Sequence, residues 1–270
     1  MNETHFISLA FYFVALIASF FAFFGRRDRI DTLATLLLQC GLLSHCLALG
    51  LIIGSEQNLR LLSANSKISM VLLLVMLGYL VLQASFGLRY VMGFYLFIPL
   101  LTHVSSLFFV SNQSAMQAAL DLNRSSHFGL FHGIFSLFAL ALLTLSFVSS
   151  VLYLLMEYRL EKKKFDFWFH RLPALNSLEL MSYRTTLMGF LFLTLSILTG
   201  ALGHHRSGSL LLRLGGYEWL MILVWLVYIF FFQVRYESGM VGGRLSWIAL
   251  VAYTLQCIAM FFFLMGNHPF

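Results

Sequence analysis

Charged side chains are scarce in this chain. Of its 270 residues, 10% are Asp, Glu, Lys or Arg and 60% are hydrophobic, and the mean hydropathy is +0.87. A water-soluble protein of this length needs a more polar surface, so the composition excludes a soluble globular domain and indicates a membrane protein with several spans. No acidic pair occurs inside the apolar runs and no inverted repeat is evident, which argues against a transporter coupled to protons or cations.

The chain also lacks the alternating apolar and polar pattern of membrane β-strands. Its apolar runs are about 20 residues long, as a membrane-crossing helix requires, and a helix satisfies every backbone N–H inside its own segment. We therefore predict an all-α polytopic membrane protein, a bundle of eight transmembrane helices that forms a single integral membrane domain over residues 1–270. The predicted spans are approximately 5–24, 31–53, 67–86, 90–110, 129–156, 183–203, 217–235 and 245–265.

Basic residues are distributed unevenly between the connectors. If the N-terminus is outside, the inner connectors carry twelve Lys and Arg residues and the outer connectors carry five. The positive-inside rule then places both termini on the outer side of a bacterial inner (cytoplasmic) membrane. The net charge of +6 mostly reflects this bias. The first run has its arginines after it and no small-residue cleavage site, so we expect a retained span and not a cleaved signal peptide.

Cysteine is rare, and the common catalytic motifs are absent. Cys40, Cys46 and Cys257 lie inside predicted helices without a CxxC pair, and we expect them to be small apolar core residues. No GxSxG elbow, HExxH helix or P-loop occurs. We therefore expect no enzymatic turnover by the chain's own residues. Any reaction would be that of a bound cofactor, which the protein would ligate and shield.

Histidine, in contrast, is concentrated on one side of the predicted membrane. Eight of the nine histidines map to the outer half or the outer surface, and only His170 lies inside. Neutral imidazole ligates iron, zinc or copper, so imidazoles from different helices can together build a site for haem or a metal. The outer histidines are His5, His45, His103, His127, His132, His204, His205 and His268. Ordinary interfacial positions would account for His5, His127 and His205.

Three of these histidines differ in their surroundings. His45 and His103 lie within apolar helices, where both an interhelical hydrogen bond and a ligand role stay open. His132 is the strongest candidate ligand, because it lies one turn into the fifth predicted helix between Gly129 and Gly133. These glycines leave room for a flat ring to approach the backbone.

Several ordered segments of the second half resemble the cytochrome c assembly protein family. They are the stretch from His132 through LYLLMEYRLEKKKF, then LPALNSLELMSYRTTLMGFLFLTLSILTGA, WLVYIFFFQVRYESGMVGGRLSWIALVAYTLQ and the terminal MGNHPF. The resemblance is strongest over residues 129–270. The family includes CcsA, CcmC and the branch of HemX and YpjD. The chain resembles this branch in its length of eight helices and in the segment LLSHCLALG of the second helix.

This resemblance implies a haem site. In the family, two external histidines flank a tryptophan-rich outer segment and are axial ligands of haem, and His132 and His268 match them by their places beside recognisable helices. Haem b would then be held at the outer face by these two residues, with Trp219 as an aromatic platform. His45 and His103 are the alternate ligands.

The chain also departs from the synthases of the family. Its tryptophan-rich segment is reduced to GGYEWLMILVWLVY, which keeps Glu218, Trp219 and Trp225. Gln233 stands where the synthases have an intramembrane histidine ahead of an arginine. We therefore expect that this chain alone does not attach haem to apocytochrome, and the pattern fits the HemX and YpjD branch better.

Two functions follow as expectations. In the first, the chain binds or handles haem in cytochrome c maturation or haem homeostasis, with cytochrome c assembly subunits as possible partners and no nucleic acid. In the second, it is a HemX-like membrane regulator of tetrapyrrole synthesis that acts on the level of glutamyl-tRNA reductase. The inner connector over residues 157–182 is basic, and its part around Lys162 to Arg171 would then contact the cytoplasmic enzyme. The same connector also fits an amphipathic segment lying against anionic lipid.

Overall fold

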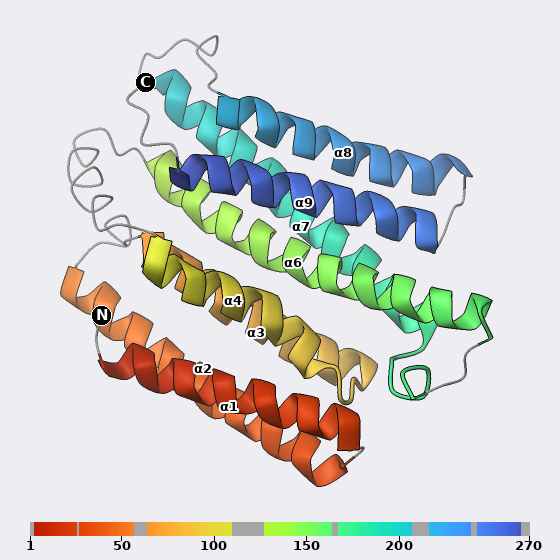
Figure 1. The fold of residues 1–270 in the computed structure, drawn as a ribbon. Coiled ribbons are helices and arrows are strands. Elements are labelled where there is room, and N and C mark those ends of the chain that lie inside the picture. The colour runs from red at the N-terminus through yellow and green to blue at the C-terminus, as the bar shows by residue number, and fades with distance from the viewer. Residues whose placement is uncertain are drawn as a thin grey trace. The chain divides into compact units, whose positions relative to one another are not determined.

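The computed structural model describes residues 3–25, 27–56, 64–109, 127–163, 167–206, 216–238 and 242–265 of the chain. Within these ranges it contains eight α-helices and no β-strand (Figure 1). The predicted all-α class is confirmed for this part of the chain.

The helices coincide closely with the predicted apolar runs. They are α1 (Glu3–Gly25), α2 (Asp28–Glu56), α3 (Ala64–Phe86), α4 (Met92–Phe109), α6 (His127–Glu161), α7 (Leu175–Arg206), α8 (Gly216–Ser238) and α9 (Gly243–Met265). Seven are long and apolar enough to cross a membrane, while the apolar part of α4, Met92–Ser105, is shorter. The chain is thus a multi-pass helical membrane protein. The C-terminal end of α6 and the N-terminal end of α7 exceed the predicted spans, because good helix formers such as Glu157 and Glu179 continue the helix beyond the apolar run.

The helices fall into two compact units. Unit 1 comprises Met1–Asn123 and Phe165–Pro173 and contains α1 to α4, and unit 2 comprises Arg124–Lys164 and Ala174–Phe270 and contains α6 to α9. Consecutive helices alternate in direction within each unit, so α6 and α8 begin at the end of unit 2 where α7 and α9 finish (Figure 1). A single domain over residues 1–270 stays a prediction, as does the outer position of both termini.

Small side chains line the interface of α6 and α7, which pack more closely than any other helix pair in the described ranges. At Gly189 of α7, an added Cβ would lie 2.7 Å from the Cγ of Leu143 in α6. Two turns away along each helix, the buried hydroxyls of Ser150 and Ser182 are hydrogen-bonded at 2.7 Å. Small residues and interhelical hydroxyl bonds allow such close approach, because lipid supplies no hydrophobic driving force between helices.

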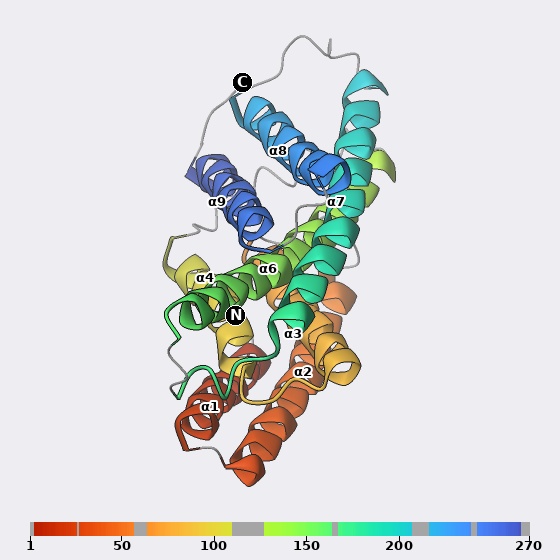
Figure 2. The same ribbon diagram turned by 90° about the vertical axis from the view of Figure 1, so that its right-hand side faces the viewer.

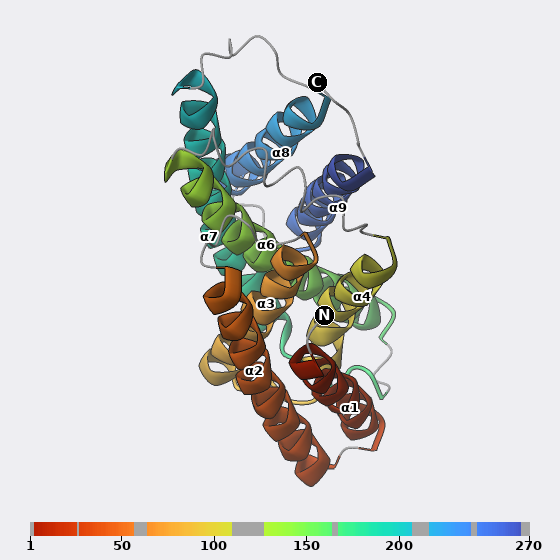
Figure 3. The ribbon, with the colours of Figure 1, turned by 90° about the vertical axis from the view of Figure 1, so that its left-hand side faces the viewer.

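The core of unit 2 is built by all four of its helices, which Figures 2 and 3 show from opposite sides. Its buried members are Ala139, Leu143, Leu193, Val224, Tyr228, Ala252 and Tyr253. Tyr253 of α9 and Thr144 of α6 are hydrogen-bonded through their hydroxyl oxygens at 2.9 Å. The polar end of this tyrosine therefore has a partner although its ring is buried.

At the end of unit 2 where α6 ends and α9 begins, polar contacts connect neighbouring helices. The backbone N–H of Gly243 donates to Oε1 of Glu157 over 3.2 Å, so a carboxylate of α6 satisfies a free backbone donor at the start of α9. Arg235 of α8 donates to Oε1 of Glu179 in α7 over 3.1 Å. The same guanidinium lies 4.0 Å from the ring centroid of Tyr183.

The aromatic residues between α6 and α7 belong to unit 1 and pack on α1. The ring of Trp168 lies 5.1 Å from that of Phe23 in α1, and the rings of Phe167 and Phe24 are stacked at 5.7 Å. The guanidinium of Arg171 lies 3.7 Å from the ring centroid of Phe167. The aromatic side chains in this part of the basic connector therefore pack against other side chains of the protein.

The expectation that the cysteines are core residues is wrong. Cys40, Cys46 and Cys257 are all exposed on their helices. A thiol is small and only weakly polar, so a lipid-facing position suits it as well as a core position does. Hydropathy alone does not distinguish these two faces of a membrane helix.

The substitution Gly189→Ala should destabilise the protein by about 1–3 kcal/mol, because the new methyl group would overlap the buried side chain of Leu143. Unfolding in detergent measures the effect. Gly50→Ala is the matched control, since nothing lies within 4 Å of a Cβ at that position. Equal stability of the two variants would contradict the close α6–α7 contact.

Candidate functional site

The predicted site residues lie in different parts of the structure. His132 is in α6 and Trp219 in α8, both in unit 2, whereas His45 and His103 are in α2 and α4 of unit 1. His268 lies outside the described residues, beyond the end of α9. The side chains of His5, His127, His204 and His205 are likewise outside the described part of the chain.

His132 is half-buried and is held by α7. Its Nδ1 lies 2.8 Å from the backbone carbonyl oxygen of Ser196 and 3.1 Å from the Ser196 hydroxyl. A carbonyl oxygen only accepts, so the network assigns the ring proton to Nδ1 and leaves the lone pair of the neutral imidazole on Nε2. Metal-binding histidines characteristically have one ring nitrogen fixed by such a carbonyl while the other faces the metal.

Glycines on both helices shape the surroundings of the His132 ring. At Gly200 of α7, an added Cβ would lie 3.0 Å from Nδ1 and 3.3 Å from Cε1, so any larger residue would press on the ring. Gly129 and Gly133 of α6 have nothing within 4 Å of an added Cβ. They border open space, as their position beside His132 led us to expect.

The helix period places His132 at one end of the core of unit 2. His132 lies on the same face of α6 as Ala139 and Leu143, because it precedes Ala139 by two turns and Leu143 by three. These two residues pack in the core with residues of α7, α8 and α9. At the His132 end of the core α8 begins and α9 finishes, so the chain beyond α9, which carries His268, starts from this end (Figure 1).

The two tryptophans of α8 differ in the exposure and the contacts of their rings. Trp219 is 61% exposed in the first turn of α8, at the same end of unit 2 as His132. Trp225 donates from Nε1 to Oγ1 of Thr194 over 3.0 Å and stacks on Phe190 at 6.2 Å. Trp219 is thus the tryptophan whose ring is accessible, whereas Trp225 serves packing between α7 and α8.

In unit 1, His45 and His103 are buried together, with ring centroids 6.3 Å apart. Nδ1 of His45 lies 3.1 Å from the Tyr12 hydroxyl, and Nε2 lies 2.6 Å from Oγ of Ser69. One polar cluster therefore joins all four helices of unit 1. Both ring nitrogens of His45 are engaged, so ligation of a metal would require one of these bonds to break.

A bare metal ion and haem iron differ in the number of protein ligands that they need. No group of three or more His, Cys, Asp or Glu that could hold a metal ion occurs in the described ranges. Haem iron needs at most two axial ligands from the protein, because the porphyrin supplies the equatorial nitrogens.

Sequence reasoning did not identify Ser196, Gly200, Tyr12 and Ser69 as partners of the histidines. Each is a small or polar residue in an apolar run, which is a general signal for an inward-facing position. The identity of the partner depends on the rotation of two helices relative to each other, and one sequence does not specify that rotation.

Comparison with known proteins gives a family match and two informative relatives. The family model described as Cytochrome C assembly protein matches residues 3–268. The inner membrane protein YpjD of Escherichia coli (strain K12) is 26% identical over 207 residues, which cover 77% of this chain and 74% of YpjD. The cytochrome c biogenesis protein CcsA of Synechococcus sp. (strain RCC307) is 33% identical over 73 residues, 27% of this chain and 24% of CcsA. No solved structure matches the chain.

Tyr12→Phe should lower the free energy of unfolding by about 0.5–1.5 kcal/mol, because it removes the hydrogen bond to His45 and keeps the ring. A double-mutant cycle with His45→Phe, measured by denaturant unfolding in detergent, should give a coupling of about 0.6 kcal/mol. Tyr236→Phe is a suitable control, since Tyr236 is 91% exposed. A coupling near zero between Tyr12 and His45 would be inconsistent with the polar cluster.

Proposed function

Since the chain belongs to the cytochrome c assembly protein family, we propose that it is a haem-binding protein of the bacterial inner membrane that holds haem b at the His132 end of unit 2. It would act in cytochrome c maturation or haem homeostasis. The predicted family is confirmed, with a match that extends beyond residues 129–270 to nearly the whole chain. The names of the relatives YpjD and CcsA support the location and the process, respectively.

The hydrogen bond from Nδ1 of His132 to the Ser196 carbonyl is the observation that carries the proposal. An axial ligand of haem iron must offer a lone pair, and this bond directs the lone pair to Nε2. His132 therefore fits one axial position. His268 would supply the second, as the family resemblance implies, from the segment that follows α9.

Apolar rings beside His132 suit the edge of a porphyrin. Phe131 and Phe135 stack at 6.2 Å, and Phe135 lies 6.1 Å from Phe192 of α7. The helix period places Phe131 and Phe135 on one side of His132 and the two glycines of α6 on the other. A flat apolar group could then approach α6 between them, with Trp219 as an aromatic platform from α8.

Bound haem would supply iron and its redox chemistry. The chain's own residues would ligate, orient and shield it, and the proposal includes no turnover by a protein side chain. His45 and His103 are the alternate ligand pair in unit 1. They are less favoured because His45 would have to give up its bond to Tyr12 or to Ser69.

Haem titration of the purified protein tests this proposal. The wild type should give a low-spin Soret and α-band, and His132→Ala and His268→Ala should each change the spectrum, because each removes an axial ligand. Gly200→Ala should also weaken binding, because its methyl group would press on the His132 ring.

His170→Ala is the matched control for this titration, since His170 is exposed in the connector between α6 and α7. Unchanged spectra in both His132→Ala and His268→Ala would remove these residues from the ligand list. If His45→Ala or His103→Ala abolished the spectrum instead, the ligand pair would lie in unit 1.

A regulatory role is the second candidate, and the exposure of Lys162 and Lys163 directly after α6 favours it. Like their neighbour Lys164 in sequence, these residues are basic, and an exposed basic cluster can contact an acidic surface of a cytoplasmic enzyme. In this case the chain would be a HemX-like regulator of glutamyl-tRNA reductase.

Replacing Lys162, Lys163 and Lys164 together by Gln should leave haem binding intact and alter the cellular level of glutamyl-tRNA reductase, because only the basic contact is lost. Immunoblotting of the reductase measures this, with Arg244→Gln at the start of α9 as the control. An unchanged reductase level would argue against regulation through these lysines, and loss of haem binding would contradict the separation of the two surfaces.

A further inference from the structure

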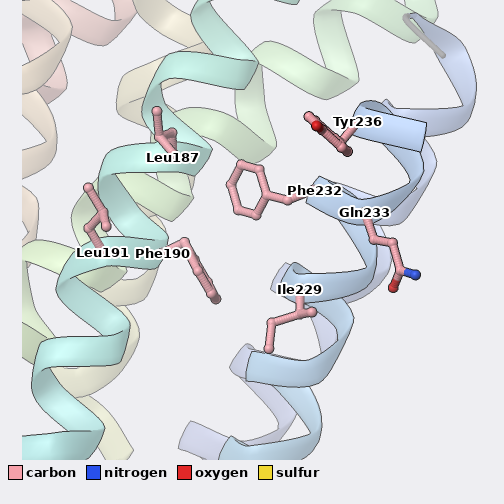
Figure 4. A pocket seen from close by; sticks show the side chains of 7 residues that line it. All are labelled: Leu187, Phe190, Leu191, Ile229, Phe232, Gln233 and Tyr236. Atoms are coloured by element: carbon pink, nitrogen blue, oxygen red, sulfur yellow. The ribbon is translucent and has the colours of Figure 1, made fainter. Parts of the chain in front are cut away.

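An open groove of about 520 Å³ lies between α7 and α8, away from His132. Phe190 and Leu191 contribute to its α7 side, and Ile229 and Phe232 to its α8 side (Figure 4). Polar groups occur only at one end of the lining, where Tyr236 and Gln233 lie. The groove is therefore an apolar trough with a polar end.

In the membrane, this groove would face the hydrocarbon of the lipid. Both α7 and α8 are candidate membrane spans, and only 17% of the apolar window of α8 is buried, the smallest share among the seven spans. Leu191 in the groove is 50% exposed. Water does not stably fill an apolar groove at this depth, so an acyl chain is the occupant whose chemistry matches the lining.

Arg184 of α7 precedes the groove lining and places a cation toward its polar end. Arg184 is exposed and precedes Leu187 and Leu191 by three and seven residues, a spacing that places all three on one face of α7. Because α7 and α8 are antiparallel, Arg184 is at the same end as Tyr236, which is 91% exposed. Gln233 at this end donates from Nε2 to Oε1 of Glu237 over 3.2 Å.

These groups match the parts of a phospholipid in order. A guanidinium binds a phosphate through parallel N–H donors, and tyrosine favours the depth of the headgroups, where its ring is apolar and its hydroxyl is wet. The apolar trough then begins one turn further along α7, where an acyl chain would start. We propose that the α7–α8 groove binds one anionic phospholipid, with an acyl chain between the two helices and the phosphate at Arg184.

A bound lipid would also account for the sparse packing of α8. Within the described ranges, α7 and α8 share far fewer contacts than α6 and α7. The rings of Phe190 and Phe232 touch, with centroids 5.2 Å apart, so a chain lodged in the groove would lie along this contact and cover the exposed side of Leu191. This site is independent of the proposed haem site.

Native mass spectrometry of the protein released from phosphatidylglycerol-containing nanodiscs tests the proposal. The wild type should retain one phosphatidylglycerol, and Arg184→Gln should reduce retention about fivefold, because one cation at a lipid surface contributes roughly that factor. Leu187→Trp should reduce it by filling the groove. Nanodiscs of phosphatidylcholine should leave less lipid bound than those of phosphatidylglycerol.

Two control variants match the chemistry of the test variants. Arg244→Gln removes an exposed arginine outside the groove, and Leu198→Trp places the same indole at an exposed position of α7 outside the lining. Equal retention in Arg184→Gln and Arg244→Gln would overturn the phosphate assignment. A dimer that dissociates in Leu187→Trp but not in Leu198→Trp would instead make the groove an interface between two copies and overturn the lipid proposal.

Discussion

The close approach of α6 and α7 is the constraint on which the candidate site depends. Gly189 and the buried serines bring the two backbones together, and at the other end of the same interface the Ser196 carbonyl reaches the imidazole of His132. Gly200 contributes because a larger residue would displace the ring. One interface therefore serves both the stability of unit 2 and the orientation of a potential ligand. Membrane helices commonly associate through small residues in this way.

The two units use histidine in different ways. In unit 1, His45 is bonded through both ring nitrogens and connects α2 with α1 and α3. In unit 2, the hydrogen bonds described for the His132 ring are both at Nδ1, and open space adjoins the neighbouring glycines. A histidine bonded at both ring nitrogens supports packing, whereas one fixed at Nδ1 keeps the Nε2 lone pair that our proposal assigns to haem iron.

The contacts at the two ends of unit 2 also differ in kind. One end combines His132 with the exposed ring of Trp219, while the other combines the Glu179–Arg235 ion pair with the carboxylate of Glu157 at the start of α9. The proposed lipid groove opens near this second end, along α8, whose apolar window has the smallest buried share of the seven candidate spans. The two proposals therefore concern separate surfaces of one helical unit.

Much of the fold was predictable from hydropathy, because a helix in lipid must satisfy its backbone internally and so follows its apolar run. The boundaries of α1, α8 and α9 agree with their predicted spans to within about three residues, which is the usual uncertainty at helix ends. The extension of α7 back to Leu175 was missed, since helices continue into polar sequence that hydropathy does not report. The exposure of the cysteines was also missed, because hydropathy treats the core and the lipid alike.

The sequence by itself therefore determined the helical class and the approximate spans, since these follow from composition and run length. The clustering of histidines toward one face stays a prediction. The sequence also pointed to His132 through its neighbouring glycines. Only the tertiary structure decided that His132 is held by Ser196, that His45 is bonded on both sides, and that the aromatic connector packs on α1. These outcomes depend on the rotation and approach of helices distant in sequence, which the packing of small side chains sets and hydropathy does not encode.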